Sequence, residues 1–308
     1  MRAYFDRIWR RAKTPLAVPL GPVQLLLSMR RAVKVSSNRR RRALHAHAGN
    51  PHASFAPDVV TATRSDFHAA LTSTTEVAIV VGAGPGFGYG LATRLVRAGL
   101  RVALVSRNAE RHDPLVATLS LTQPWVRAYG CDATSESSVT DMFEHAASDL
   151  GAPSLVVYAV QEGGRAKFLE AEVFAVEQAW RANCLGAFVV AREAGRRMVA
   201  QGKGTIVMVG ATSGLIGRAG YVNFAPGKFG LRALSQVAAR ELGPHGVHVA
   251  HLIIDADIAE SGEAPSSRPT MQALDIAELV YQLHRQPKSA WTQELDARPH
   301  DERYWEHC

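Results

Sequence analysis

The chain has 308 residues, of which 47% are hydrophobic and 20% charged, enough apolar sequence to build one large α/β core. Its net charge of +7 comes from the beginning of the chain. Residues 1–64 hold 13 Lys or Arg against two Asp, whereas the remaining 244 residues carry 22 basic and 26 acidic side chains. The high isoelectric point therefore does not predict nucleic-acid binding by the folded part.

Residues 1–45 form a basic leader, nearly free of acidic side chains, with the composition of an organelle import presequence. We expect mitochondrial localisation, with the cytoplasm as the alternative. A disordered basic tail, or a nuclear or RNA-contacting patch at residues 39–42, would explain the same composition. The apolar stretch at residues 15–29 is too short and interrupted to span a bilayer, so no integral membrane segment is predicted. Residues 46–75 are interpreted as a linker.

An apolar strand at residues 76–81 runs into alternating glycines and then into a helix expected to begin near residue 89. This pattern is typical of a dinucleotide pyrophosphate site, because the helix N-terminus supplies free amides to the phosphates. Gly82 allows the turn off the strand, Gly86 admits the phosphates and Gly88 lets the helix pack on the strand. The predicted cofactor-binding residues of this turn are Gly82, Gly84, Gly86, Phe87 and Gly88.

The next expected strand, residues 101–106, ends with Ser106 followed by Arg107. At this position an Asp or Glu holds the ribose hydroxyls of NAD, whereas a small residue followed by Arg accommodates the 2′-phosphate of NADP. We therefore predict NADP(H) as the cofactor. Asp132, at the end of a third strand, is a candidate contact for the adenine amino group. Capping of the following helix would explain Asp132 equally well.

Strands and helices continue to alternate along the chain. Further strands are expected at residues 125–130, 154–160, 204–210 and 247–254, and long helices at 177–199 and up to 242. Alternating βα units with apolar strands predict a doubly wound parallel α/β sheet of the Rossmann type, as a single domain over residues 76–308.

Cysteines and histidines do not indicate a metal site. Cys131, Cys184 and Cys308 lack paired spacing, so neither a disulfide framework nor a zinc site is predicted, and a reducing compartment is favoured. His248 and His251 lie on an expected strand, where alternation puts them on opposite faces.

Four motifs follow one another in the folded part: Gly82-x-x-x-Gly86-x-Gly88, Cys131-Asp-Ala-Thr, Trp180-Arg-Ala-Asn183, and Ser213 with Gly-Lys228. In this order and spacing the chain, from about residue 76 onward, resembles the short-chain dehydrogenase/reductase family. The resemblance implies hydride transfer at a carbonyl or alcohol. In the family a Tyr donates or accepts the proton, and a Lys lowers the pKa of that Tyr. A Ser holds the carbonyl oxygen, and an Asn organises a water relay. It assigns the Asn role to Asn183 and the Lys role to Lys228, which also grips the nicotinamide ribose.

The chain departs from the family pattern where the chemistry is centred. Phe224 stands four residues before Lys228, where the family places Tyr, and Ala211 stands where it places Ser. Phenylalanine has no proton to give, so the usual mechanism cannot operate unchanged. The resemblance is therefore to an atypical subgroup with Phe in place of the catalytic Tyr.

Tyr221 and Ser213 are the nearest substitutes for the missing hydroxyls. Tyr221 lies seven residues before Lys228, so it shares nearly the same face if the helix extends that far. Pro226, which favours a first helical turn, argues instead that Tyr221 lies in the preceding loop. A half-buried loop aromatic without a catalytic role is the alternative interpretation.

Asp255 follows the sixth strand, where the family has Pro-Gly. The amides of this segment are candidates for contacting the cofactor carboxamide. The alternative role of Asp255, which the residue type favours, is to cap a short following helix.

Two classes of function are consistent with these residues. The first is an NADPH-dependent reductase or dehydrogenase acting on a small carbonyl or alcohol; the second is an NADP-binding protein with little or no turnover, acting as a sensor or an assembly partner. By family analogy we expect a homo-oligomer formed through helices at residues 173–199 and 224–242. The residues expected to contact substrate, 161–170, Tyr221 and 256–270, carry no motif that identifies it.

Overall fold

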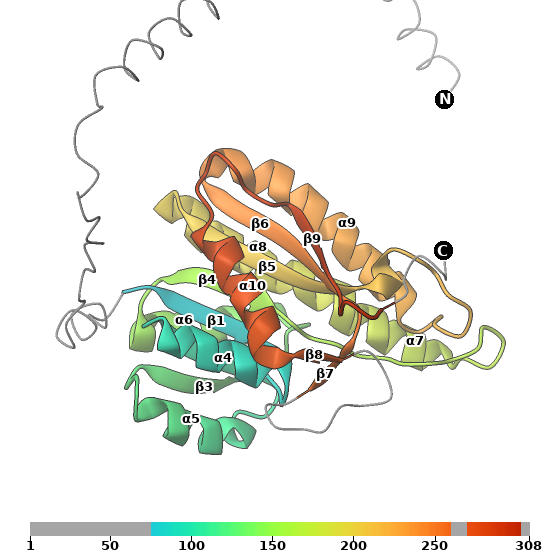
Figure 1. Cartoon of the computed structure of the whole chain (residues 1–308), viewed down its shortest axis with the longest axis horizontal. Coiled ribbons are helices and arrows are strands. Elements are labelled where there is room, and N and C mark those ends of the chain that lie inside the picture. The colour runs from blue at the N-terminus through green and yellow to red at the C-terminus, as the bar shows by residue number, and fades with distance from the viewer. Residues whose placement is uncertain (1–74, 260–269, 303–308) are drawn as a thin grey trace, which may run out of the picture. The chain divides into compact units, whose positions relative to one another are not determined.

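The computed structural model describes residues 75–259 and 270–302 (Figure 1). The predicted leader and nearly all of the linker lie outside these residues, as does Cys308. The described part contains one seven-stranded parallel sheet, with the strand order β3-β2-β1-β4-β5-β6-β9 (Figure 1). Its strands are β1 (Val77–Val81), β2 (Arg101–Ser106), β3 (Val126–Gly130), β4 (Pro153–Tyr158), β5 (Gly204–Ala211), β6 (Val247–Ile254) and β9 (Glu294–Ala297).

Helices cover both faces of this sheet, because the strands bury side chains on both sides (Figure 1). On β1, Ala78 and Val80 belong to the apolar core shared with α4 and α10, whereas Val77 and Ile79 belong to the core shared with α6 and α8. The helices are α4 (Phe87–Arg97), α5 (Asp113–Ser120), α6 (Glu136–Leu150), α7 (Val173–Trp180), α8 (Gly186–Gln201), α9 (Ala225–Leu242) and α10 (Ala273–Arg285). The predicted doubly wound fold is confirmed.

The strand order reverses between β1 and β4. From β1 the chain builds β2 and β3 on one side, and it then returns to place β4, β5 and β6 on the other. In open parallel sheets, ligands bind outside the carboxyl ends of the strands at such a reversal. The glycine turn after β1 lies at this point, where the sequence places the cofactor.

The expected helix at residues 177–199 is longer and less regular than predicted. It runs from α7 through a π-helical turn at Arg181–Leu185 into α8. The turn contains Asn183, so the irregular backbone coincides with a predicted catalytic residue. Single π-helical turns inside α-helices are frequent at functional sites.

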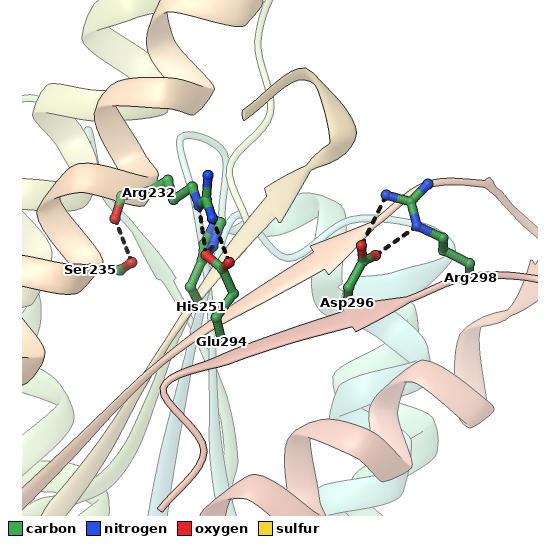
Figure 2. A network of polar contacts seen from close by, with 6 residues as sticks. All are labelled: Arg232, Ser235, His251, Glu294, Asp296 and Arg298. Carbon is green, nitrogen blue, oxygen red and sulfur yellow. Dashed lines mark hydrogen bonds and ion pairs between the residues drawn. The ribbon is translucent and has the colours of Figure 1, made fainter. Parts of the chain in front are cut away.

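Charged side chains attach the last strand to its neighbours. Glu294 on β9 accepts two hydrogen bonds of 2.7 Å from Arg232 of α9, and it lies 3.0 Å from Nδ1 of the buried His251 on β6. Figure 2 shows this cluster together with Asp296, also on β9, which pairs with Arg298 at 2.8 Å. These contacts hold β9 beside β6. After β9 the chain continues to Arg298, near the carboxyl ends of the strands.

A short parallel pair, β7 (Asp257–Ala259) and β8 (Thr270–Gln272), follows β6. The predicted capping role of Asp255 is therefore wrong, because the segment after β6 continues as a strand and not as a helix. No helix of the described residues is long and apolar enough to cross a membrane.

Candidate active site

The glycine turn is shaped by contacts that leave no room for side chains. Gly82 has φ +86°, and a Cβ there would lie 2.6 Å from the backbone nitrogen of Val160. A Cβ on Gly88 would lie 2.8 Å from Cα of Ala83, so this glycine lets α4 pack against the end of β1, as predicted. Gly86 has φ +77° and caps α4, which begins at Phe87 rather than near residue 89.

This turn fits a pyrophosphate. A Cβ on Gly84 would meet nothing closer than the Arg111 guanidinium, 4.0 Å away, so the backbone there is open to a ligand. The first amides of α4 have no acceptor within the helix and carry the positive end of its dipole. Gly82, Gly84, Phe87 and Gly88 all line one cavity of about 810 Å³.

The end of β2 presents a hydroxyl and a guanidinium. Ser106 Oγ donates to the backbone oxygen of Asn108 at 2.8 Å and lies 2.7 Å from Nε2 of His112. The Arg107 side chain is 83% exposed and comes within 3.9 Å of a Glu162 carboxylate oxygen. Arg107 is thus accessible to a ligand that brings a negative charge to the end of β2.

Asp132 does not cap the helix that follows it. Its Oδ1 accepts from the backbone nitrogen and the hydroxyl of Thr134, at 2.9 and 2.8 Å, and thereby closes a local turn. The cap of α6 is Ser135, whose hydroxyl accepts from the backbone nitrogen of Ser138. The capping interpretation of Asp132 is wrong, and its contact with adenine stays a prediction.

Asn183 and Lys228 are both buried, and each has backbone partners near the cavity. Asn183 Nδ2 donates to the backbone oxygens of Glu162 and Ala179, at 2.6 and 2.8 Å. Lys228 Nζ donates to the backbone oxygen of Val209 at 3.2 Å, and burial lowers the pKa of Lys228 to about 8. A Cβ on Gly227 would lie 2.9 Å from Cβ of Asn183, so the two segments pack closely.

Phe224 occupies the position of the family tyrosine and is 7% exposed. Its ring lies 5.5 Å from Nζ of Lys228, within reach of a cation–π interaction. Phe224 is the N-cap of α9 and Pro226 lies in the first turn, as expected for proline. The helix therefore does not extend to Tyr221.

Tyr221 lies in the loop before α9 and lines the cavity. Its hydroxyl accepts a hydrogen bond of 3.1 Å from Nε of Arg165, whose guanidinium also lies 5.5 Å from the centre of the Tyr221 ring. Arg165 falls within the loop at residues 161–170 that is expected to contact substrate, but no role was predicted for it individually. Nothing in the sequence pairs it with a tyrosine 56 residues later.

Ser213 lies in a 3-10 helix at Thr212–Gly214 and lines the cavity. The neighbouring hydroxyl of Thr212 is buried and accepts from Nη2 of Arg298 at 3.0 Å. Ala211 ends β5 just before them. Of the two hydroxyls near the vacant Ser position, Thr212 is already engaged by Arg298.

Arg298 also holds the segment after β6, a role that no motif in the sequence predicted. Its Nη1 donates to Asp255 at 2.8 Å and to Glu302 at 3.3 Å. Asp255, Asp301 and Glu302 line the cavity, so the C-terminal segment closes one of its walls. Among residues 75–259 and 270–302, no three His, Cys, Asp or Glu side chains are grouped to hold a metal ion.

Residues 76–256 match the family model described as short chain dehydrogenase. The chain belongs to the short-chain dehydrogenase family. Its fold is the one that the family resemblance implies, and the roles of the glycine turn, Asn183 and Lys228 stay predictions. The resemblance to a subgroup that has Phe at position 224 stays a prediction.

The chain is also similar to named proteins of this kind. It is 29% identical over 203 residues to the D-threitol dehydrogenase of Mycolicibacterium smegmatis, covering 65% of this chain and 76% of the relative. A short-chain dehydrogenase from Rhodopseudomonas palustris has a solved structure that is 35% identical, with a TM-score of 0.67, covering 74% of this chain and all of that one.

A solved alcohol dehydrogenase from Thermococcus sibiricus, complexed with 5-hydroxy-NADP, shares the fold at 23% identity. Its TM-score is 0.67, and the match covers 74% of this chain and 98% of that one. Solved structures of this fold contain NADP in some cases and NAD in others.

Proposed function

We propose that the chain is an NADPH-dependent reductase of a small or medium carbonyl compound, which also catalyses the reverse oxidation of the alcohol. The observation that carries this proposal is the pair of Lys228 and Asn183, which are both buried and held by backbone oxygens, that of Lys228 belonging to Val209 in the cavity lining. A buried lysine with a lowered pKa is costly to keep, and Lys228 has no ion-pair partner within the described part of the chain, which favours a chemical role.

The bound cofactor supplies the hydride. The protein's own residues bind, orient and protonate: the glycine turn and the α4 amides hold the pyrophosphate, and Lys228 holds the nicotinamide ribose. Asn183, whose Nδ2 fixes the backbone oxygen of Glu162, shapes the path by which water reaches Lys228.

Tyr221 is the proposed proton donor in place of the missing family tyrosine. Because the Arg165 guanidinium donates to the phenolic oxygen, the phenolic hydrogen has to point elsewhere, and Tyr221 lines the cavity. Ser213, which also lines the cavity, is the proposed hydroxyl that holds the carbonyl oxygen.

The proposed preference for NADPH rests on Ser106 and Arg107 at the end of β2. Measuring the affinities for NADPH and NADH tests it. Arg107 is exposed and a charge-assisted contact with a 2′-phosphate contributes about 1.5 to 3 kcal/mol, so NADPH should bind at least about tenfold more tightly than NADH. Ser106→Asp should reverse the preference, because it adds a carboxylate that repels the phosphate and accepts from ribose hydroxyls. Equal affinity of the wild-type protein for the two cofactors would remove the support for Arg107.

A second function is favoured by Phe224 and Ala211, which replace two of the family's catalytic side chains. It is cofactor binding with little or no turnover. Titration of the protein with NADPH, followed by measurement of NADPH consumption over a broad panel of aldehydes and ketones, separates the two. Consumption of NADPH with one class of carbonyl supports the reductase; tight binding without consumption across the panel supports the binding protein.

A homo-oligomer is proposed through α8 and α9. Phe188 on α8 and Phe229 and Val237 on α9 are 41%, 42% and 52% exposed, which is unusual for large apolar side chains within a pair of adjacent helices. Light scattering coupled to size exclusion measures the mass directly. A monomer at micromolar concentration would exclude this assembly.

A further inference from the structure

A chain of hydrogen bonds lies behind the end of β2, where the 2′-phosphate of NADP is proposed to bind. His112, at the end of a 3-10 helix at Glu110–His112, is fully buried. Its Nε2 lies 2.7 Å from Ser106 Oγ, and its Nδ1 lies 3.3 Å from the hydroxyl of Tyr89 on α4. The Tyr89 hydroxyl also reaches the backbone oxygen of Arg111, at 3.2 Å.

The hydrogens of this chain can be assigned by counting donors. Ser106 has one hydroxyl hydrogen and donates it to Asn108, so the bond between Ser106 and His112 requires a hydrogen on Nε2. The neutral imidazole therefore carries its hydrogen on Nε2, and its Nδ1 accepts from Tyr89. Because Nε2 supplies the hydrogen of the bond to His112, Ser106 keeps its own hydroxyl hydrogen, which is held by the backbone oxygen of Asn108 and can turn from there to a bound phosphate.

The same chain also accommodates the protonated imidazole. If Nδ1 gains a hydrogen, it donates to the Tyr89 oxygen, and the Tyr89 hydroxyl turns its own hydrogen to the backbone oxygen of Arg111. Rotation of one phenolic hydrogen thus satisfies both states of His112. A change of protonation here leaves no buried donor without an acceptor.

The charges around His112 decide which state the protein without cofactor adopts. Burial lowers the pKa of His112, the neighbouring Arg111 lowers it further, and Asp113 raises it, with the result below the ordinary histidine value. The groups that face His112 from α4 and β2 are the hydroxyls of Tyr89 and Ser106. In the sequence between Ser106 and Asp113, the other charged residues are Arg107, Glu110 and Arg111.

We propose that His112 determines cofactor specificity: it fixes Ser106 as a hydrogen-bond donor toward the 2′-phosphate, and it takes up a proton from solvent at Nδ1 when that phosphate binds. This inference rests on the proposed use of NADP(H). A phosphate dianion at Ser106, Arg107 and Arg111 favours the imidazolium one hydrogen bond away, whereas NADH brings no such charge.

Proton uptake on binding tests this directly. Calorimetric titrations of wild-type protein with NADPH and with NADH at pH 7, each in two buffers of different ionisation enthalpy, give the number of protons exchanged. An opposite charge close to an imidazole raises its pKa, so we expect net proton uptake with NADPH and none with NADH. The affinity ratio of NADPH to NADH should therefore rise as the pH falls from 8 to 6.5.

His112→Gln is the matched variant, because its amide still donates to Ser106 but gains no proton. The 2′-phosphate itself titrates equally in both proteins, so its contribution is subtracted. After this subtraction, His112→Gln should show no proton uptake on NADPH binding and no pH dependence of the NADPH-to-NADH affinity ratio. Tyr89→Phe, which removes the acceptor for the Nδ1 hydrogen while keeping the ring, is the second variant and should reduce the uptake without changing the affinity for NADH.

The outcomes separate this inference from the function beneath it. A preference for NADPH with the same proton uptake in wild type, His112→Gln and Tyr89→Phe would overturn the role of His112 alone. Equal affinity of the wild-type protein for NADPH and NADH, without uptake, would overturn both this role and the proposed choice of cofactor.

Discussion

Lys228 is a buried lysine whose ionisation is set by its place beneath the cavity. Burial lowers its pKa to about 8, and its one hydrogen-bond acceptor among the described residues is the backbone oxygen of Val209. In the unfolded chain the pKa of a lysine is about 10.4. The unfolded state therefore binds more protons than the folded state between about pH 8 and pH 10.4.

This difference makes stability depend on pH with a defined sign. The contribution of Lys228 to the free energy of unfolding increases by up to roughly 3 kcal/mol as the pH rises through that window. The reason is that the cost of burying the charge disappears once the amine is neutral. Lys228→Met should be more stable than wild type at pH 7, and its advantage should shrink as the pH approaches 10. Urea unfolding of both proteins at several pH values measures this; a difference that is constant with pH would contradict the buried charge.

The hydrogen-bond and ion-pair partners of the site residues could not be predicted from the neighbouring sequence. The family motifs fix the spacing of Asn183, Phe224 and Lys228, and of these three residues Phe224 lines the cavity. The capping role of Asp132 failed because its carboxylate closes a turn with Thr134 instead, and that of Asp255 failed because its partner is distant in sequence. Asp255 is engaged by Arg298, 43 residues later, and no local pattern contains that distance.

At the level of elements, the strands were predicted closely because buried parallel strands are unbroken apolar runs. The expected strand at 101–106 is β2, and that at 247–254 is β6. Helix interiors were predicted less well: α7 begins at Val173, as the expected helix at 173–199 does, but the π-helical turn at Arg181–Leu185 has no signal in hydrophobic periodicity.

The segment after β9 is an element whose importance the structure reveals. Arg298 joins it to the ends of β5 and β6 through Thr212 and Asp255, and its side chain is 14% exposed. Arg298→Met keeps the length of the side chain but removes these bonds, leaving partly buried carboxylates without a partner.

We expect Arg298→Met to cost about 2 kcal/mol of folding stability and to weaken NADPH binding on the order of tenfold, because the cavity wall moves. The control is Arg285→Met, which breaks an exposed ion pair with Glu76 and should change stability by less than about 0.5 kcal/mol. Thermal unfolding and fluorescence titration check both variants. If the two behave alike, Arg298 does not hold the wall.

For the whole molecule, the sequence divides the chain into a basic leader and a folded domain. Deletion of residues 1–64 should leave NADPH affinity and thermal stability unchanged, because this stretch lacks the sustained amphipathic pattern of a helix that joins a core. We also propose that it directs mitochondrial import. Fused to a fluorescent reporter, residues 1–64 should carry it into mitochondria; a reporter found in the cytosol or nucleus would refute the targeting role.

The central claim is that this chain reduces a carbonyl with Tyr221 as proton donor, although Phe224 fills the family position. The most direct measurement is the steady-state rate of NADPH consumption by wild type, Tyr221→Phe and Phe224→Tyr with the preferred carbonyl of the wild-type protein. Loss of a positioned acid lowers turnover by about 10² to 10⁴, so Tyr221→Phe should fall by this factor while NADPH affinity stays within a few-fold.

Phe224→Tyr should raise the rate, since it restores a phenol beside Lys228. Unchanged turnover in Tyr221→Phe would show that the proton comes from another group. Absence of turnover in all three proteins would contradict the reductase and leave the binding protein.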